Sequence, residues 1–203
     1  VLSNSFANVW LKLSDTFHEH QQQTLQKIVN TTLPKSIIGR MTEGETIIAD
    51  AYREITVVFM DIVGFAAVPE AETPTRIVKF LNYLFSKFDK MTKMIGIEKI
   101  KTMGDAYLAV GGAPDILHND NFTQKCMQFS LAMLAEVNEL NSEKSSLRLS
   151  RKDIQIRIGL ATGPAIGGVI GTAKKIFDIW GSTINRASRL ESSGIPGRIQ
   201  VDS

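Results

Sequence analysis

The sequence is poor in the features that mark several large classes of protein. It contains a single cysteine, Cys126, so it has neither a disulfide framework nor a cysteine-based zinc site. We expect Cys126 to be a small buried helix residue. No apolar run reaches the roughly 18–20 residues that a membrane span needs. Polar residues also interrupt the apolar ones at the start, where a signal peptide has a continuous apolar segment.

The sequence also lacks a large excess of positive or negative charge. The net charge is +2, whereas a nucleic-acid-binding domain has a strong basic excess, so we expect no nucleic acid partner. The 203 residues are 43% hydrophobic, enough for one domain with a core. The chain starts without Met and stops after a strand-like stretch, as a piece of a larger protein would.

The first 32 residues have the composition of a polar helix with approximate heptad spacing. Two interpretations stay open: a solvated helix packed on the domain, or a linker helix that pairs with its copy in a dimer. Pro34 ends this helix, because the residue before proline disfavours helical angles. A second short helix is expected over 35–41. We therefore divide the chain into a helical linker, 1–42, and a main domain, 43–203.

The apolar pattern of the main domain predicts alternating strands and helices. Residues 55–61 form a β-branched run of strand length, and apolar residues recur at helical spacing over 75–94. The other expected elements are strands over 97–102 and 106–110, a helix over 122–140, and a strand over 154–162. They are followed by a strand over 177–180, a helix over 183–190 and a strand over 198–201. This order predicts an α+β fold: a ferredoxin-like βαββαβ core with an antiparallel sheet, helices on one face and additional C-terminal elements.

Two aspartates stand at the ends of expected strands. Asp61 ends the first strand, and Asp105 lies between the second and third. The first and third strands of a βαββαβ sheet are neighbours, so the two carboxylates are expected to converge. Paired carboxylates suit Mg²⁺ or Mn²⁺ and leave room for phosphates. Aspartate is also an ordinary turn residue after a strand, so both interpretations remain at this point.

Other polar positions and a glycine-rich stretch are less specific. The glycines at 163, 167, 168 and 171 are expected to break up the chain, and their spacing fits neither a P-loop nor a dinucleotide fingerprint. Close backbone approach explains them better. Isolated residues such as Lys101 and Asp178 usually lie on a solvated surface. Asn185 and Arg189 share one helix face, and arginine is well suited to phosphate oxygens.

Three segments resemble the catalytic domain of class III adenylyl and guanylyl cyclases. They are 58–65 (VFMDIVGF), 99–107 (KIKTMGDAY) and 177–189 (FDIWGSTINRASR), and the resemblance runs from about residue 33 to 201. Residues 33–37 and 44–46 are similar to the entry segment of receptor-type guanylyl cyclases. In that group the segment follows a helical linker from an upstream domain, so the resemblance implies a cytoplasmic domain whose parent protein carries an upstream sensor or membrane domain. The resemblance makes 43–203 a cyclase catalytic domain truncated at its C-terminal end, since the family has a phosphate-binding lysine in a later strand.

The resemblance implies roles for the metal-binding segment. Asp61 and Asp105, with the backbone carbonyl of Ile62, match the residues that bind two divalent cations, Mg²⁺ or Mn²⁺. Ile62, Gly64 and Phe65 are expected to contact the substrate.

The resemblance also implies roles for the residues that hold the nucleotide. Lys101 and Asp178 match the positions that read the purine, and Lys with Asp selects adenine, where Glu with Cys selects guanine. Asn185 matches the residue that orients the ribose, and Arg189 the residue that steadies the α-phosphate in the transition state.

The implied enzyme is an adenylyl cyclase that converts ATP into 3′,5′-cyclic AMP and pyrophosphate. In the family one subunit supplies the metal aspartates and the other the base-reading and transition-state residues, so a homodimer through the catalytic face is expected. Two alternatives stay open: a cyclase with guanine or mixed specificity, and a catalytically silent regulatory domain. The three histidines, His18, His20 and His118, lie outside the motifs and are expected on the surface.

Overall fold

The computed structural model describes residues 21, 33–70, 72–115, 121–142 and 153–202. The three histidines and all of the expected N-terminal helix except Gln21 lie outside these residues. Within the described part of the chain, no helix is both long and apolar enough to cross a membrane.

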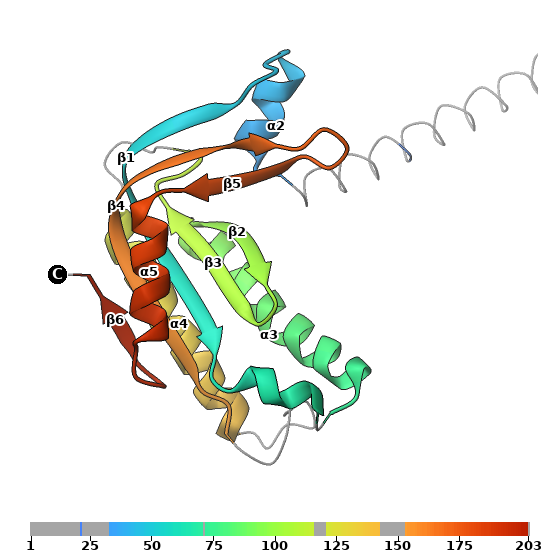
Figure 1. Cartoon of the computed structure of the whole chain (residues 1–203), viewed down its shortest axis with the longest axis vertical. Coiled ribbons are helices and arrows are strands. Elements are labelled where there is room, and N and C mark those ends of the chain that lie inside the picture. The colour runs from blue at the N-terminus through green and yellow to red at the C-terminus, as the bar shows by residue number, and fades with distance from the viewer. Residues whose placement is uncertain (1–20, 22–32, 71, 116–120, 143–152, 203) are drawn as a thin grey trace, which may run out of the picture.

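One sheet organises the molecule, and its strands follow the order β2-β3-β1-β4-β5 (Figure 1). The strands are β1 (Ala49–Ile62), β2 (Glu98–Met103), β3 (Ala106–Gly111), β4 (Ile156–Ile170), β5 (Ile176–Trp180) and β6 (Ile199–Val201). All pairs are antiparallel except β4 with β6. The predicted α+β fold with a βαββαβ core is confirmed, and β1 and β3 are neighbours as expected.

Two helices cover one face of the sheet, as expected for a ferredoxin-like core. They are α3 (Pro74–Ile95) and α4 (Phe122–Ser142). The Thr73 side chain accepts a hydrogen bond from the Arg76 amide and so caps α3, while Gly96 ends it in the left-handed region at φ 79°. Their apolar sides pack on the side chains of β1 that point to this face, such as Val58 and Met60.

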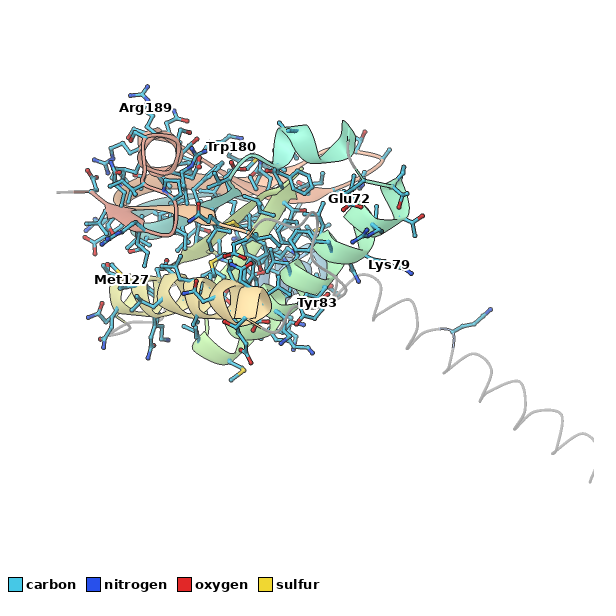
Figure 2. All side chains as sticks on the ribbon, turned by 90° about the horizontal axis from the view of Figure 1, so that it is seen from below. Glu72, Lys79, Tyr83, Met127, Trp180 and Arg189 are labelled. Atoms are coloured by element: carbon cyan, nitrogen blue, oxygen red, sulfur yellow. The ribbon has the colours of Figure 1, made fainter. Side chains whose placement is uncertain are left out.

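Additional helices lie on the opposite face, where Figure 2 shows the helix that carries Arg189. They are α2 (Lys35–Thr42) and α5 (Ser182–Ser192). Ile37 of α2 and Ala187 of α5 are fully buried there, against β1 residues that alternate with the first set, such as Ile55 and Val57. The expectation that helices cover one face therefore holds for the core pair, α3 and α4, and not for α2 and α5. A short 3₁₀ helix, η1 (Phe65–Glu70), follows β1.

The strands β1 and β4 are longer than the sequence pattern predicts, and they bend. The pairing register shifts between Tyr52 and Ile55 of β1, and such an irregularity increases the local twist. Beyond it, β1, β4 and β5 continue past the β2–β3 hairpin and curl toward it (Figure 1). The two outermost strands of the sheet, β2 and β5, therefore come close together.

The glycines at 163, 167 and 168 lie inside β4, so the expectation that they break up this stretch is wrong. Close backbone approach explains Gly168, as expected: a Cβ atom there would lie 2.6 Å from the carbonyl oxygen of Ile48. Gly171, with φ +99°, does form the turn after β4.

Candidate active site

The two predicted metal-binding aspartates converge at one end of the sheet. Asp61 lies near the end of β1, and Asp105 lies in the turn between β2 and β3. Met60 pairs with Tyr107 across β1 and β3, so the register brings the turn beside Asp61. Burial, followed by the charge of Asp105 and then that of Glu191, raises the pKa of Asp61 to about 6. The carboxylates are thus close enough to repel each other.

The donor chemistry of this pair fits a divalent cation. Two hard oxygen ligands whose negative charges repel each other form a site where a cation relieves the repulsion. Among the described residues no three acidic, histidine or cysteine side chains form a complete ligand set. A metal ion here would therefore need further oxygens from backbone or substrate, as Mg²⁺ commonly does.

One arginine joins Asp61 to a carboxylate that the sequence analysis did not single out. Arg157 of β4 pairs with Asp61 in the strand register and donates from Nη2 to Asp61 Oδ2 at 3.5 Å. Its Nε donates to Glu191 Oε1 of α5 at 2.9 Å. Glu191 follows Thr183 and Ala187 at four-residue spacing on the buried side of the helix. A glutamate on the buried side of a helix is almost always paired with a cation. The four-residue spacing of Glu191 from Ala187 could therefore have predicted such a partner from the sequence.

The neighbouring substrate-binding candidates take up different environments. Ile62 ends β1 with a buried side chain. Gly64 adopts φ 73°, which turns the chain out of the strand. The Phe65 ring belongs to the core between the sheet and α3, so only the backbone of Phe65 is available to a ligand.

The two predicted base-reading residues form an ion pair. Lys101 Nζ lies 2.5 Å from Asp178 Oδ2. Lys101 comes from β2 and Asp178 from β5, at opposite ends of the strand order, so the pair depends on the curl of the sheet. The Asp178 side chain is 12% exposed, and its other oxygen accepts from the Ile179 amide. The aspartate is therefore fixed, and the 35% exposed lysine is the more accessible partner.

Asn185 and Arg189 project from the solvent side of α5. The buried residues of this helix are Thr183, Ala187 and Glu191. At 100° per residue, positions 185 and 189 lie roughly opposite that stripe. Both residues are exposed, and Figure 2 shows Arg189 pointing away from the sheet. These two side chains face away from the aspartate pair of their own chain.

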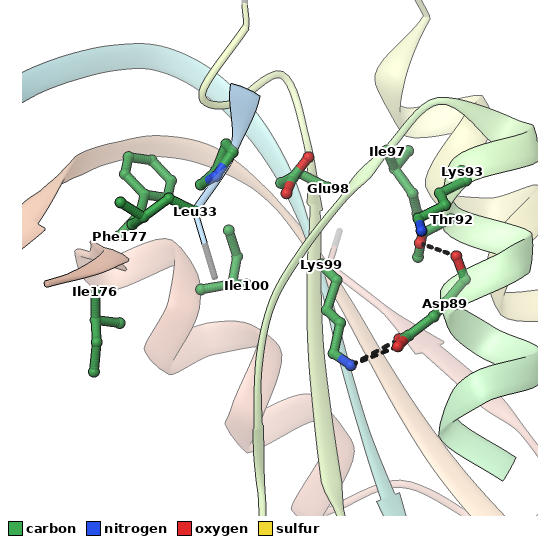
Figure 3. Close-up of a pocket in the computed structure, with 11 residues that line it drawn as sticks. Leu33, Asp89, Thr92, Lys93, Ile97, Glu98, Lys99, Ile100, Ile176 and Phe177 are labelled. Carbon is green, nitrogen blue, oxygen red and sulfur yellow. Dashed lines mark hydrogen bonds and ion pairs between the residues drawn. The ribbon is translucent and has the colours of Figure 1, made fainter. Parts of the chain in front are cut away.

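A cavity of about 340 Å³ lies beside the base-reading pair, between α3, β2, β5 and the start of α2 (Figure 3). Ile100 and Phe177 line it and immediately precede Lys101 and Asp178 in the chain. On its other side Lys99 pairs with Asp89 of α3 at 2.8 Å. The side chains of Lys99 and Lys101 thus lie on opposite faces of β2, because the pairing register with β3 shifts between them. None of the predicted site residues lines this cavity.

The sole cysteine takes no part in the candidate site. Cys126 is fully buried within α4, as expected, and burial raises the pKa of its thiol to about 12.

Comparison with known proteins gives one consistent family. Residues 47–203 match the model of the adenylate and guanylate cyclase catalytic domain. The chain is 37% identical over 201 residues to an adenylate cyclase of Mycobacterium tuberculosis, covering 96% of this chain and 44% of that protein. It is 32% identical over 181 residues to the human guanylate cyclase soluble subunit beta-2, covering 89% of this chain and 28% of that protein. The chain thus spans less than half the length of these relatives.

A solved structure agrees in fold and sequence. It is the catalytic core of a rhodopsin-guanylyl cyclase with converted specificity in complex with ATPalphaS. It is 33% identical, has a TM-score of 0.67, and the match covers 75% of this chain and 79% of that one. The chain described here belongs to the class III adenylate and guanylate cyclase catalytic domain family.

Proposed function

We propose that this domain is an adenylyl cyclase that converts ATP into 3′,5′-cyclic AMP and pyrophosphate as a homodimer. The observation that carries the adenine preference is the Lys101–Asp178 pair. Adenine offers a ring-nitrogen acceptor and an amino donor, which a lysine donor and a carboxylate acceptor complement. A guanine ring would present the opposite pattern and leave the buried Asp178 carboxylate without a donor, which is a strong source of discrimination.

The matched relatives include both adenylate and guanylate cyclases, so the base preference depends on this pair alone. The solved guanylyl cyclase core with converted specificity is in complex with ATPalphaS, so nucleotide preference can change on this fold.

Asp61 and Asp105, with the Ile62 carbonyl, are the proposed ligands of two Mg²⁺ or Mn²⁺ ions, consistent with a family that uses divalent metals. Bound metal would supply charge neutralisation for the triphosphate and for the attacking 3′-hydroxyl. Gly64 and Phe65 would contact the substrate through their backbone. Asn185 would orient the ribose, and Arg189 would donate to the α-phosphate through its planar guanidinium.

The direction of α5 supports the homodimer. Asn185 and Arg189 face away from the carboxylates of their own chain, so we assign them to a nucleotide whose metal ligands belong to a second copy. A two-fold dimer would then hold two complete sites. We also propose that residues 1–42 link the catalytic domain, 43–203, to an upstream sensor or membrane domain.

A product assay with ATP and GTP in Mn²⁺, run across protein concentration, tests this function. The specific rate with ATP should exceed that with GTP and rise with concentration as dimers form. Asp105→Asn should lower the rate at least about 100-fold while the fold persists. Equal rates with the two nucleotides would refute the adenine preference, and full activity of Asp105→Asn would refute the role of the aspartate pair.

A substitution pair tests the base-reading residues themselves. Lys101→Glu combined with Asp178→Cys should shift the ATP-to-GTP ratio toward GTP by about 100-fold. The control is Lys99→Gln, which removes a lysine from the other face of the same strand and should leave the ratio unchanged. An unchanged ratio in the double variant would show that other residues read the base.

A further inference from the structure

The Asp61/Asp105 site contains its own cation. The Arg157 guanidinium reaches Asp61 at 3.5 Å, and both side chains are 26% exposed. The same guanidinium is held by Glu191 at 2.9 Å, and the Glu191 side chain is only 5% exposed. Arg157 is therefore shared unequally: its short contact is with the buried glutamate, and its long contact is with the aspartate.

Glu191 has little room to move. Its second oxygen, Oε2, lies 3.0 Å from Ser192 Oγ, whose single proton is shared with the Ser188 carbonyl oxygen at 2.9 Å. The helix that carries it lies directly on β4, where a Cβ atom on Gly159 would come within 2.5 Å of the Glu191 amide nitrogen. The helix backbone is therefore packed tightly on β4, and we expect the carboxylate to keep its place when Arg157 moves toward Asp61.

The unequal sharing matters for metal binding. An arginine that bound Asp61 at a normal hydrogen-bond distance would occupy an oxygen that a metal ion needs, and it would repel the ion. Glu191 competes for the same guanidinium through Nε and keeps Nη2 at the outer limit of a hydrogen bond to Asp61. Asp61 thus has a nearby positive charge without being tightly bound by it.

We propose that Arg157 is a built-in counter-cation that a divalent metal displaces from Asp61, and that Glu191 is a positioning residue that keeps this displacement easy. The inference rests on the proposed metal-binding role of Asp61 and Asp105. Glu191 touches neither metal nor substrate in this scheme, and it acts only through Arg157.

Mn²⁺ titration of the 203-residue chain without nucleotide tests the inference, with unbound Mn²⁺ followed by electron paramagnetic resonance. Arg157→Met should bind Mn²⁺ about fivefold more tightly, the size of a partly exposed ion pair. Glu191→Gln should bind about fivefold more weakly, because Arg157 is released toward Asp61. Asp202→Asn is the control, since Asp202 pairs with Arg186 of the same helix and not with Arg157; it should bind as the unmodified chain does.

A variant that keeps the positive charge at position 157 distinguishes the position of the guanidinium from the general effect of a nearby charge on Mn²⁺ binding. It also replaces Arg157→Met as the test if that variant does not fold. Lysine at position 157 has a single nitrogen, which cannot take the places of both Nε and Nη2 of the arginine, so it should lie against the more buried Glu191 and leave Asp61. Arg157→Lys should therefore bind Mn²⁺ more tightly although the charge is unchanged. In that background Glu191→Gln should again weaken binding. Unchanged Mn²⁺ affinity in both Arg157 variants would overturn the inference.

The Asp105→Asn variant keeps this result distinct from the proposed function. If it loses both Mn²⁺ binding and cyclase activity while the Arg157 variants bind normally, only the counter-cation inference fails. If it keeps both, the proposed metal site itself is wrong.

Discussion

Gly159 of β4 lies at the closest contact between the sheet and α5, and we expect it to tolerate no side chain. A Cβ atom there would lie 2.0 Å from the carbonyl oxygen of Ala187 and 2.5 Å from the amide nitrogen of Glu191. Both atoms belong to helix backbone, so no rotamer change relieves the clash. The helix would have to move away by on the order of 1 Å in a core packed as densely as a crystal.

The substitution Gly159→Ala should therefore lower the free energy of unfolding by about 3 kcal/mol, at the upper end of the cost of overpacking. Urea denaturation followed by circular dichroism measures this. Gly39→Ala in α2 is the matched control, because no atom lies within 4 Å of its Cβ position. Since alanine is the better helix former, it should stabilise the chain by about 0.5–1 kcal/mol.

The displaced helix carries Asn185, Arg189 and Glu191, so the folded fraction of Gly159→Ala should also lose cyclase activity. A free energy of unfolding within about 0.5 kcal/mol of the unmodified chain would refute the reasoning. It would mean that α5 can shift on β4 without cost.

Three further substitutions test buried polar groups, each by urea denaturation. Burial and then the charge of Asp115 raise the pKa of Glu98 to about 7, so the native state binds its proton more tightly than the unfolded state. The free energy of unfolding should then fall between about pH 4.5 and 7, and Glu98→Gln should remove this fall and gain about 1–2 kcal/mol at pH 8; an unchanged pH profile would contradict it. Tyr107→Phe removes a 2.7 Å hydrogen bond to Asp89 and should cost about 1–2 kcal/mol, whereas no cost would show that the bond contributes nothing. Lys87→Met leaves the buried Glu136 without its 2.9 Å partner and should cost about 1–2 kcal/mol, which a neutral residue in place of Glu136 should restore.

The sequence predicts the core of the fold because the apolar patterns there are strong. The run at 55–61 and the helical spacing at 75–94 lie within β1 and α3, which the structure extends by a few residues. The first part of β1 was missed because Ala49–Glu54 contains three charged residues and a single buried side chain, that of Tyr52. The last part of β4 was missed because its glycines provide no side-chain pattern.

The site was predictable in part for the same reason. The positions of Asp61 and Asp105 follow from strand order, and the helix period places Asn185 and Arg189 on one face. The meeting of Lys101 and Asp178 could not be derived from local pattern, because it depends on the bend of a long sheet. Arg157 was missed because a charged residue in an alternating strand normally points to solvent.

The pairing of Lys101 with Asp178 has a mechanical consequence. The two residues lie on β2 and β5, the first and last strands of the order β2-β3-β1-β4-β5. The distance between them therefore depends on how strongly the sheet is curved. A change in the curvature of the sheet would therefore change the distance between Lys101 and Asp178. If this pair reads the purine as proposed, strain at a distant part of the sheet would alter the nucleotide preference.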